Sequence, residues 1–186
     1  MVPVSLGALW LPTLLSAVFV FIASNILWMA LPFWHRRDYG KLPDEGGAMT
    51  SLSSAKSGMY IVPSVDWNKQ TAEERAERHK GPFALVLLRN PLSTFSFPTA
   101  LISFFFYNLI IAILVAYLAG HTLAAGTHYL TVFRVVGTAG ILAYSFGGVP
   151  YTIWYGKPWS VTVKDLIDGI IYGLLMAGTF GWLWPR

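Results

Sequence analysis

Two aspartates near the start of the last apolar segment are the first residues whose spacing could support chemistry. Asp165 and Asp168 lie one turn apart on the same face if that segment is helical. Two carboxylates are too few to hold a pair of metal ions, and no further acid follows them in the chain. We therefore interpret them as acids at a helix N-terminus, where the helix dipole and the neighbouring Lys164 stabilise negative charge. A further hypothesis is that Asp168 contacts Asn25, which we expect at a similar depth.

Other polar side chains also fall inside apolar segments. Asn25 and Asn108 are interpreted as groups that form helix–helix hydrogen bonds, with contact to a substrate as the alternative. Arg134 would be costly at the centre of a bilayer. It follows Tyr129 closely, so its long side chain can extend to the interface and contact lipid head groups. An ion pair and a transport or catalytic role are the alternatives for Arg134.

The remaining motifs indicate neither catalysis nor metal binding. His121 and His128 flank a short connection, but no acid or cysteine completes a metal site there. The stretch 155–158 (YGKP) lacks the first glycine and the hydroxyl residue of a P-loop. We predict no catalytic residue, no cofactor and no metal ion.

The composition is typical of a membrane protein. Of the 186 residues, 55% are hydrophobic and 12% are charged, whereas a soluble domain has about 25% charged residues. The mean hydropathy is +0.54. Cysteine is absent, which excludes disulfides and thiolate sites. The basic residues form no stripe with interleaved aromatics, so we expect the lipid bilayer and not nucleic acid as a partner.

Four apolar segments are long enough to cross a bilayer as helices. They cover about residues 9–31, 99–120, 129–149 and 164–184. A helix over the first would extend about 34 Å, enough for a hydrocarbon core of about 30 Å. Because the first 34 residues hold no charge, we expect a retained helix and not a cleaved signal. The predicted fold is an all-α membrane protein with four transmembrane helices: the first in residues 1–34, a polar insertion in 35–97, and the other three in 98–186.

Small residues at every fourth position mark three of these segments. On a helix this spacing places them along one face, where a neighbouring helix can approach closely. The last segment carries Gly169, Gly173, Ala177 and Gly181. The second segment carries Ala112, Ala116 and Gly120, and the third carries Ala139, Ala143 and Gly147. We predict that these faces pack the helices together or receive a partner helix.

The polar insertion is predicted to be a small α/β element. Asp44 is the expected cap of a helix extending to Ala55. Thr71 and Glu74 form a capping-box pattern that opens a second helix. The apolar runs 59–62 and 83–88 are expected to pair as strands. The insertion is too small for a hydrophobic core of its own, so we expect it to pack against the membrane or against a partner.

The distribution of charge predicts the orientation in the membrane. The insertion and the approach to the last segment carry eleven of the thirteen Lys and Arg residues, whereas the 121–128 connection carries none. By the positive-inside rule the insertion is cytoplasmic and both termini lie outside. Arg36, Arg37 and Lys41 follow the first segment and are candidates for binding anionic lipid head groups.

Five stretches carry a resemblance along most of the chain: 35–45 (HRRDYGKLPDE), 115–120 (VAYLAG), 133–138 (FRVVGT), 153–156 (IWYG) and 177–185 (AGTFGWLWP). Through them the chain resembles a group of uncharacterised small bacterial four-helix inner-membrane proteins. The resemblance implies a bacterial inner membrane and brings no activity. The stretch 165–169 (DLIDG) is similar to the start of the metal-binding motif of CDP-alcohol phosphotransferases, but the later arginine and aspartates of that motif are absent.

The predicted function is that of a non-enzymatic accessory or scaffold component of a membrane complex. Small-residue faces on three helices can exceed what one copy buries, which leaves room for other subunits or for self-association. A small oligomeric transporter or channel is the alternative. It would need six polar residues to converge on one path: Asn25, Asn108, Arg134, Thr138, Tyr144 and Asp168. A less favoured third function, an enzyme of lipid head groups, would need a polar pocket at the cytoplasmic face.

Overall fold

Three helical segments of the chain are long and apolar enough to cross a membrane. The computed structural model describes residues 3–66, 68–89 and 94–186. The first span covers Leu6–Ala30 and consists of the 3-10 turn η1 (Leu6–Leu9), α1 (Trp10–Asn25) and the π-helical turn η2 (Ile26–Ala30). The second is α4 (Phe97–Thr122), of 26 residues. These lengths match a hydrocarbon core of about 30 Å, so the three helical segments are compatible with the predicted membrane protein.

The third span continues beyond its predicted end at residue 149. It joins α5 (Tyr129–Ser145), the 3-10 turn η4 (Phe146–Gly148) and α6 (Val149–Tyr155), and covers 27 residues in all. Pro150 lies in the first turn of α6, where its missing N–H costs no helical hydrogen bond. The glycines therefore coincide with a 3-10 turn within the segment, and neither they nor the proline end it.

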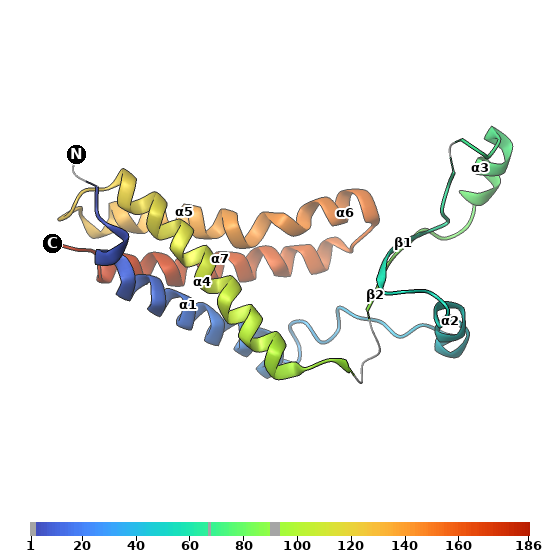
Figure 1. The fold of residues 1–186 in the computed structure, drawn as a ribbon, viewed down its shortest axis with the longest axis horizontal. Coiled ribbons are helices and arrows are strands. Elements are labelled where there is room, and N and C mark those ends of the chain that lie inside the picture. The colour runs from blue at the N-terminus through green and yellow to red at the C-terminus, as the bar shows by residue number, and fades with distance from the viewer. Residues whose placement is uncertain (1–2, 67, 90–93) are drawn as a thin grey trace.

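The last helix, α7 (Trp159–Trp182), has 24 residues and runs alongside α5 and α6 (Figure 1). It begins before the predicted start at residue 164, so Asp165 and Asp168 lie in its second and third turns. Our interpretation of both as N-terminal acids is wrong, because the dipole effect fades within the first turn. Among the described residues, length and composition qualify only the first three segments as spans. Three of the four predicted spans are thus supported, and the fourth stays a prediction.

The glycine face of α7 is closed by α5 along its length. A Cβ atom added at Gly173 would lie 2.6 Å from the backbone nitrogen of Ile141, and one at Gly169 would lie 2.8 Å from that of Ser145. At the far end, a Cβ at Gly181 would lie 2.6 Å from the ring of Tyr129. These distances leave no room for side chains, so the glycines set how closely the two helices approach.

The α5 side of this contact differs from the predicted small-residue face. Gly137 and Gly140 meet α7, and a Cβ at Gly140 would lie 2.9 Å from the Cα of Gly173. Ala143 and Gly147 are exposed, and Ala139 and Ala143 instead line a shallow cleft toward α4. The helix carries small residues on two faces, and the crossing with α7 selects the one with the two glycines.

The second helix places its small residues against the start of the chain. Ala112 and Ala116 are fully buried, and α4 packs on α1. The backbone N–H of Val4 donates to the carbonyl of Gly120 at 2.8 Å. A Cβ at Gly120 would lie 2.5 Å from the Val4 carbonyl oxygen, so only glycine permits this contact.

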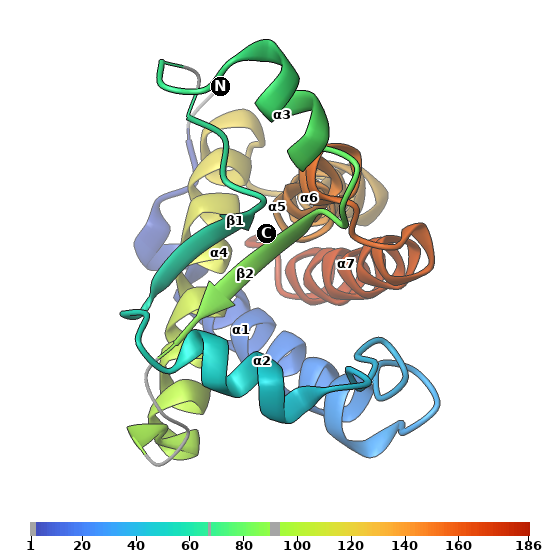
Figure 2. The same cartoon turned by 90° about the vertical axis from the view of Figure 1, so that its right-hand side faces the viewer.

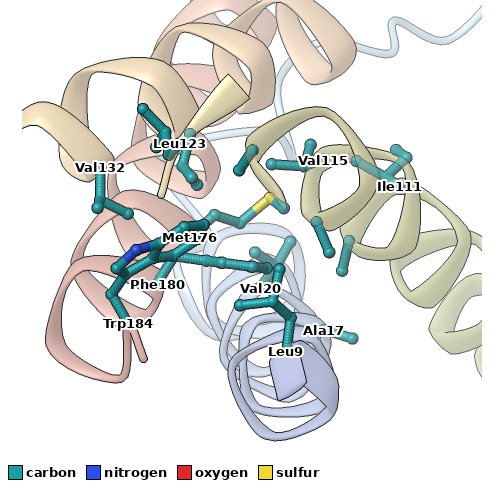
Figure 3. Close-up of a cluster of buried hydrophobic side chains, with 14 of the residues drawn as sticks. Leu9, Ala17, Val20, Ile111, Val115, Leu123, Val132, Met176, Phe180 and Trp184 are labelled. Atoms are coloured by element: carbon teal, nitrogen blue, oxygen red, sulfur yellow. The ribbon is translucent and has the colours of Figure 1, made fainter. Parts of the chain in front are cut away.

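The apolar core fills the half of the bundle that lies next to the termini. Figure 3 shows Met176 and Phe180 of α7 beside Val20 of α1, with Val132 of α5 near them. Trp184 lies at this end of the core, and its indole N–H donates to the carbonyl of Ala124 at 2.9 Å. Both termini lie at this end, and the insertion lies at the other (Figure 1).

The insertion forms the predicted α/β element. It contains α2 (Glu45–Leu52), β1 (Gly58–Val62), α3 (Ala72–Arg78) and β2 (Ala84–Leu88), with β1 and β2 paired antiparallel. Asp44 caps α2, and Thr71 and Glu74 form the capping box of α3. No described residue from 40 to 89 is buried. The element stands beyond the end of the helices (Figure 1), so it lies in front of them when the molecule is viewed from that end (Figure 2).

Candidate functional site: a polar cavity at the insertion end of the bundle

A cavity of about 570 Å³ lies between the ends of the helices nearest the insertion. The lining comes from the end of α1 with η2, residues 38–39, the first turns of α4, the end of α5 with η4, Lys157 before α7, and the first half of α7. The polar lining residues include Asn25, Asp38, Tyr144, Lys157, Asp165, Asp168 and Tyr172. A volume of this size is typical of small-molecule sites, which occupy about 300–1,000 Å³.

His35 is the centre of the polar network beside this cavity. Its ring Nδ1 lies 2.7 Å from Asp38 Oδ2, and its Nε2 lies 2.8 Å from Asp168 Oδ2. The histidine is 3% exposed, and Trp28 stacks on its ring with centroids 3.9 Å apart. Each ring nitrogen of His35 therefore has a carboxylate partner, and the two contacts fix the ring between residues 38 and 168.

Trp34 and Lys164 complete the network and attach the segment after η2 to α7. The indole N–H of Trp34 donates to Asp168 Oδ1 at 2.7 Å. The ammonium of Lys164 donates to the carbonyl oxygen of Trp34 at 2.6 Å and also to Asp38. Burial disfavours the charged form of Asp38, but the hydrogen bonds and positive charges of Lys164 and His35 outweigh it and lower the pKa of Asp38 below its usual value.

A second ion pair joins Lys157 to Asp165 at the edge of the cavity. Lys157 lies between α6 and α7, and its ammonium donates to Asp165 Oδ2. Both side chains are partly exposed, at 29% and 24%. The pair is therefore open to solvent, whereas the His35 network is enclosed.

Aromatic rings form the inner part of the cavity. The hydroxyl of Tyr144 donates to Asn108 Oδ1 at 3.0 Å, and the Asn108 amide donates to the carbonyl of Phe104 at 2.8 Å. Tyr144 also meets the rings of Tyr107 and Tyr172 edge-on. Asn108 thus makes the helix–helix hydrogen bond that its position indicated. Tyr172 is buried, and its hydroxyl lies within reach of the side chain of Trp28.

The predicted polar site residues fall in three different places. Asp168 lies inside the network, and Asn25 lines the same cavity. The expected contact between them is not formed, because Asn25 donates to the carbonyl of Phe21 at 2.7 Å while Asp168 binds Trp34 and His35. Arg134 is exposed on α5 and forms no ion pair with a described residue.

The candidate lipid-binding residues Arg36, Arg37 and Lys41 are all exposed, with Lys41 near Glu45. The outer histidines are separate: His121 contacts the carbonyl of Tyr117, and His128 caps α5.

These positions bear on the alternative functions. Asn25, Tyr144 and Asp168 meet at one end of the bundle, while Thr138 and Arg134 are exposed on α5. The polar residues named for a transport path therefore do not converge, and apolar side chains fill the opposite end. A polar cavity is present, as the head-group enzyme would need. Among the described residues, no group of three acids or histidines could hold a metal ion.

Sequence reasoning missed His35 and Tyr172 as parts of the site. The spacing of His35 and Asp38, three residues apart, is a local signal for their contact. Tyr172 follows Asp168 by four residues, which places both on one face of α7. No local pattern could bring His35 to Asp168, because 133 residues separate them.

The chain matches no protein-family model, no curated protein sequence and no solved structure. Its likeness to small bacterial inner-membrane proteins therefore stays a prediction.

Proposed function

We propose that this chain is a four-helix protein of the bacterial cytoplasmic membrane and acts as a non-enzymatic accessory component of a membrane complex. In this proposal α7 is the fourth span. Its 24 residues extend about 36 Å, enough to cross the hydrocarbon core. Its charged residues Lys164, Asp165 and Asp168 lie in the half near the insertion, and each has an oppositely charged or polar partner. Partnered charges near one end are tolerated in a spanning helix.

The position of the termini supports an even number of spans. Val4 bonds to Gly120, and the backbone N–H of Gly126 donates to the carbonyl of Pro185 at 2.8 Å. Both chain ends therefore lie beside the 121–128 connection, which carries no Lys or Arg. Arg36, Arg37, Lys157 and Lys164 lie at the opposite end. This asymmetry supports a cytoplasmic insertion with both termini outside.

The main support for the accessory function is an exposed apolar face on the β1–β2 hairpin of the insertion. Met59 pairs with Leu87 and Ile61 with Leu85, so these four apolar side chains share one face of the two strands. Met59 is 64% exposed and Leu87 66% exposed. Among the described residues, no helix of the bundle packs extensively on the hairpin. An isolated two-stranded hairpin is marginal in water, so a protein partner that covers this face would stabilise it.

Site-specific photo-crosslinking in intact cells tests this function. A photoreactive side chain at position 87 should give one discrete adduct with another protein, identified by mass spectrometry. The same group at position 73, on the charged surface of α3, is the matched control and should give no such adduct. Leu87→Asp should prevent co-purification of the partner while leaving the melting temperature of the helix bundle unchanged. Adducts with lipid alone, or with the chain itself alone, would contradict the proposal.

A further inference from the structure

The charged side chains that line the cavity are already paired within the protein. The carboxylates of Asp38, Asp165 and Asp168 each have a Lys, His or Trp partner. Lys157, whose ammonium also lies in the lining, is the partner of Asp165. A charged ligand would lose its hydration without meeting an unpaired counter-charge, so the lining favours an uncharged ligand.

Two uncharged polar groups in the lining retain hydrogen-bonding capacity. The Asn25 amide donates to the carbonyl of Phe21, but its own oxygen accepts no hydrogen bond from a described residue and is not enclosed by protein. Tyr107 is 46% exposed, and its hydroxyl likewise forms no hydrogen bond with the described part of the chain. An amide oxygen accepts and a phenolic hydroxyl can donate, whereas an alcohol does both. A ligand hydroxyl can therefore satisfy Asn25 and Tyr107 together.

Much of the remaining lining is apolar or aromatic. Leu101 and Phe104 of α4 line the cavity together with Tyr144 and Tyr172, whose hydroxyls already have partners. Such a wall accommodates an alkyl chain and offers it no hydrogen bond. The volume of about 570 Å³ is sufficient for a small molecule with a polar head and an apolar tail.

We propose that this cavity binds an uncharged amphiphile with a hydroxyl head group, held by Asn25 and Tyr107, with its alkyl chain against Leu101 and Phe104. The hydroxyl can belong to a neutral membrane lipid such as a diacylglycerol or to a free long-chain alcohol. The site is independent of the hairpin face to which we assign the accessory function.

Two binding measurements on the full chain test the proposal. Fluorescence titration in detergent compares dodecanol, dodecylamine and dodecanoate, which share an alkyl chain and differ in head group, each corrected for its partition into micelles. Dodecanol should bind at least about tenfold more tightly than either charged analogue, because its head group gives up no charge hydration. Native mass spectrometry after release from nanodiscs of diacylglycerol, phosphatidylethanolamine and phosphatidylglycerol tests the lipid. Enrichment of diacylglycerol assigns the ligand to the membrane; dodecanol binding without it assigns a free alcohol, and both results support the site.

Two substitutions make the site assignment falsifiable. Asn25→Leu and Tyr107→Phe should each weaken dodecanol binding or diacylglycerol enrichment about tenfold. Tyr151→Phe, at an exposed tyrosine outside the cavity, is the matched control and should have no effect. Tyr107→Phe should leave the melting temperature of the ligand-free protein unchanged, because the hydroxyl it removes bonds to no described residue, so this variant decides the test even if Asn25→Leu does not fold. Equal or tighter binding of dodecylamine or dodecanoate, binding of neither alcohol, or unchanged binding by Tyr107→Phe would overturn the proposal.

Discussion

Replacing Gly173 with alanine tests whether the close approach of α5 and α7 holds the bundle together. The added methyl carbon would lie 2.6 Å from both the backbone nitrogen and the Cγ1 atom of Ile141, and 3.1 Å from the carbonyl oxygen of Gly137. Contacts between non-bonded heavy atoms are optimal at about 3.5–4.0 Å, so the helices must separate by about 1 Å. Two of these three atoms are backbone, so a rotamer change cannot relieve the clash.

The expected cost follows from this geometry. Overpacking a well-packed contact costs about 1–3 kcal/mol. The intrinsic preference for alanine over glycine in a helix, about 1 kcal/mol in water, offsets part of that cost. Gly178 is the matched control because it lies in the same helix and a Cβ there meets nothing within 4 Å. Gly178→Ala should be neutral or slightly stabilising, so we expect the two variants to differ by about 1–3 kcal/mol.

Equilibrium unfolding in mixed detergent micelles with increasing dodecyl sulfate measures this difference. Loss of helix circular dichroism gives the free energy of unfolding of each variant against the unmodified chain. Equal stabilities of Gly173→Ala and Gly178→Ala would refute the reasoning, because they would mean that the glycine face of α7 is not closed by α5. Gly140→Ala, whose Cβ would lie 2.9 Å from the Cα of Gly173, provides the same test from the other helix.

Three further predictions concern the polar groups. Tyr144→Phe removes the donor to the buried Asn108 and should cost about 0.6–2 kcal/mol in the same unfolding assay, whereas the exposed Tyr151→Phe should cost nothing measurable. His35→Gln and Asp168→Asn should show non-additive losses in a double-mutant cycle, while Asn25→Leu with Asp168→Asn should come closer to additivity; the reverse ranking would contradict the contacts seen here. Because the pKa of Asp38 is lowered in the folded state, its contribution to stability is fully present above its ordinary value of 3.8 and is lost as pH falls through the lower folded value. Melting temperatures recorded below pH 4 should therefore fall more steeply for the unmodified chain than for Asp38→Asn, and parallel curves would argue against this role.

Local patterns were enough to predict the elements of this protein. Apolar runs of about 20 residues located the three candidate spans, because such length matches the bilayer. The helix caps at Asp44 and Thr71 could be predicted from the sequence because each side chain bonds to a backbone N–H only three residues away. The last helix was placed furthest from its observed start, since Trp159 and its neighbours extend it beyond the apolar run that marked its start.

The sequence by itself determined which segments are helices and which of them carry small residues. It could not determine which face of α5 meets α7, because that helix carries small residues on two faces and only the crossing of the two helices selects Gly137 and Gly140 over Ala143 and Gly147. Nor could it place His35 between Asp38 and Asp168. Those features join residues far apart in the chain, and they arise only where helices that pack closely near the termini diverge at the opposite end.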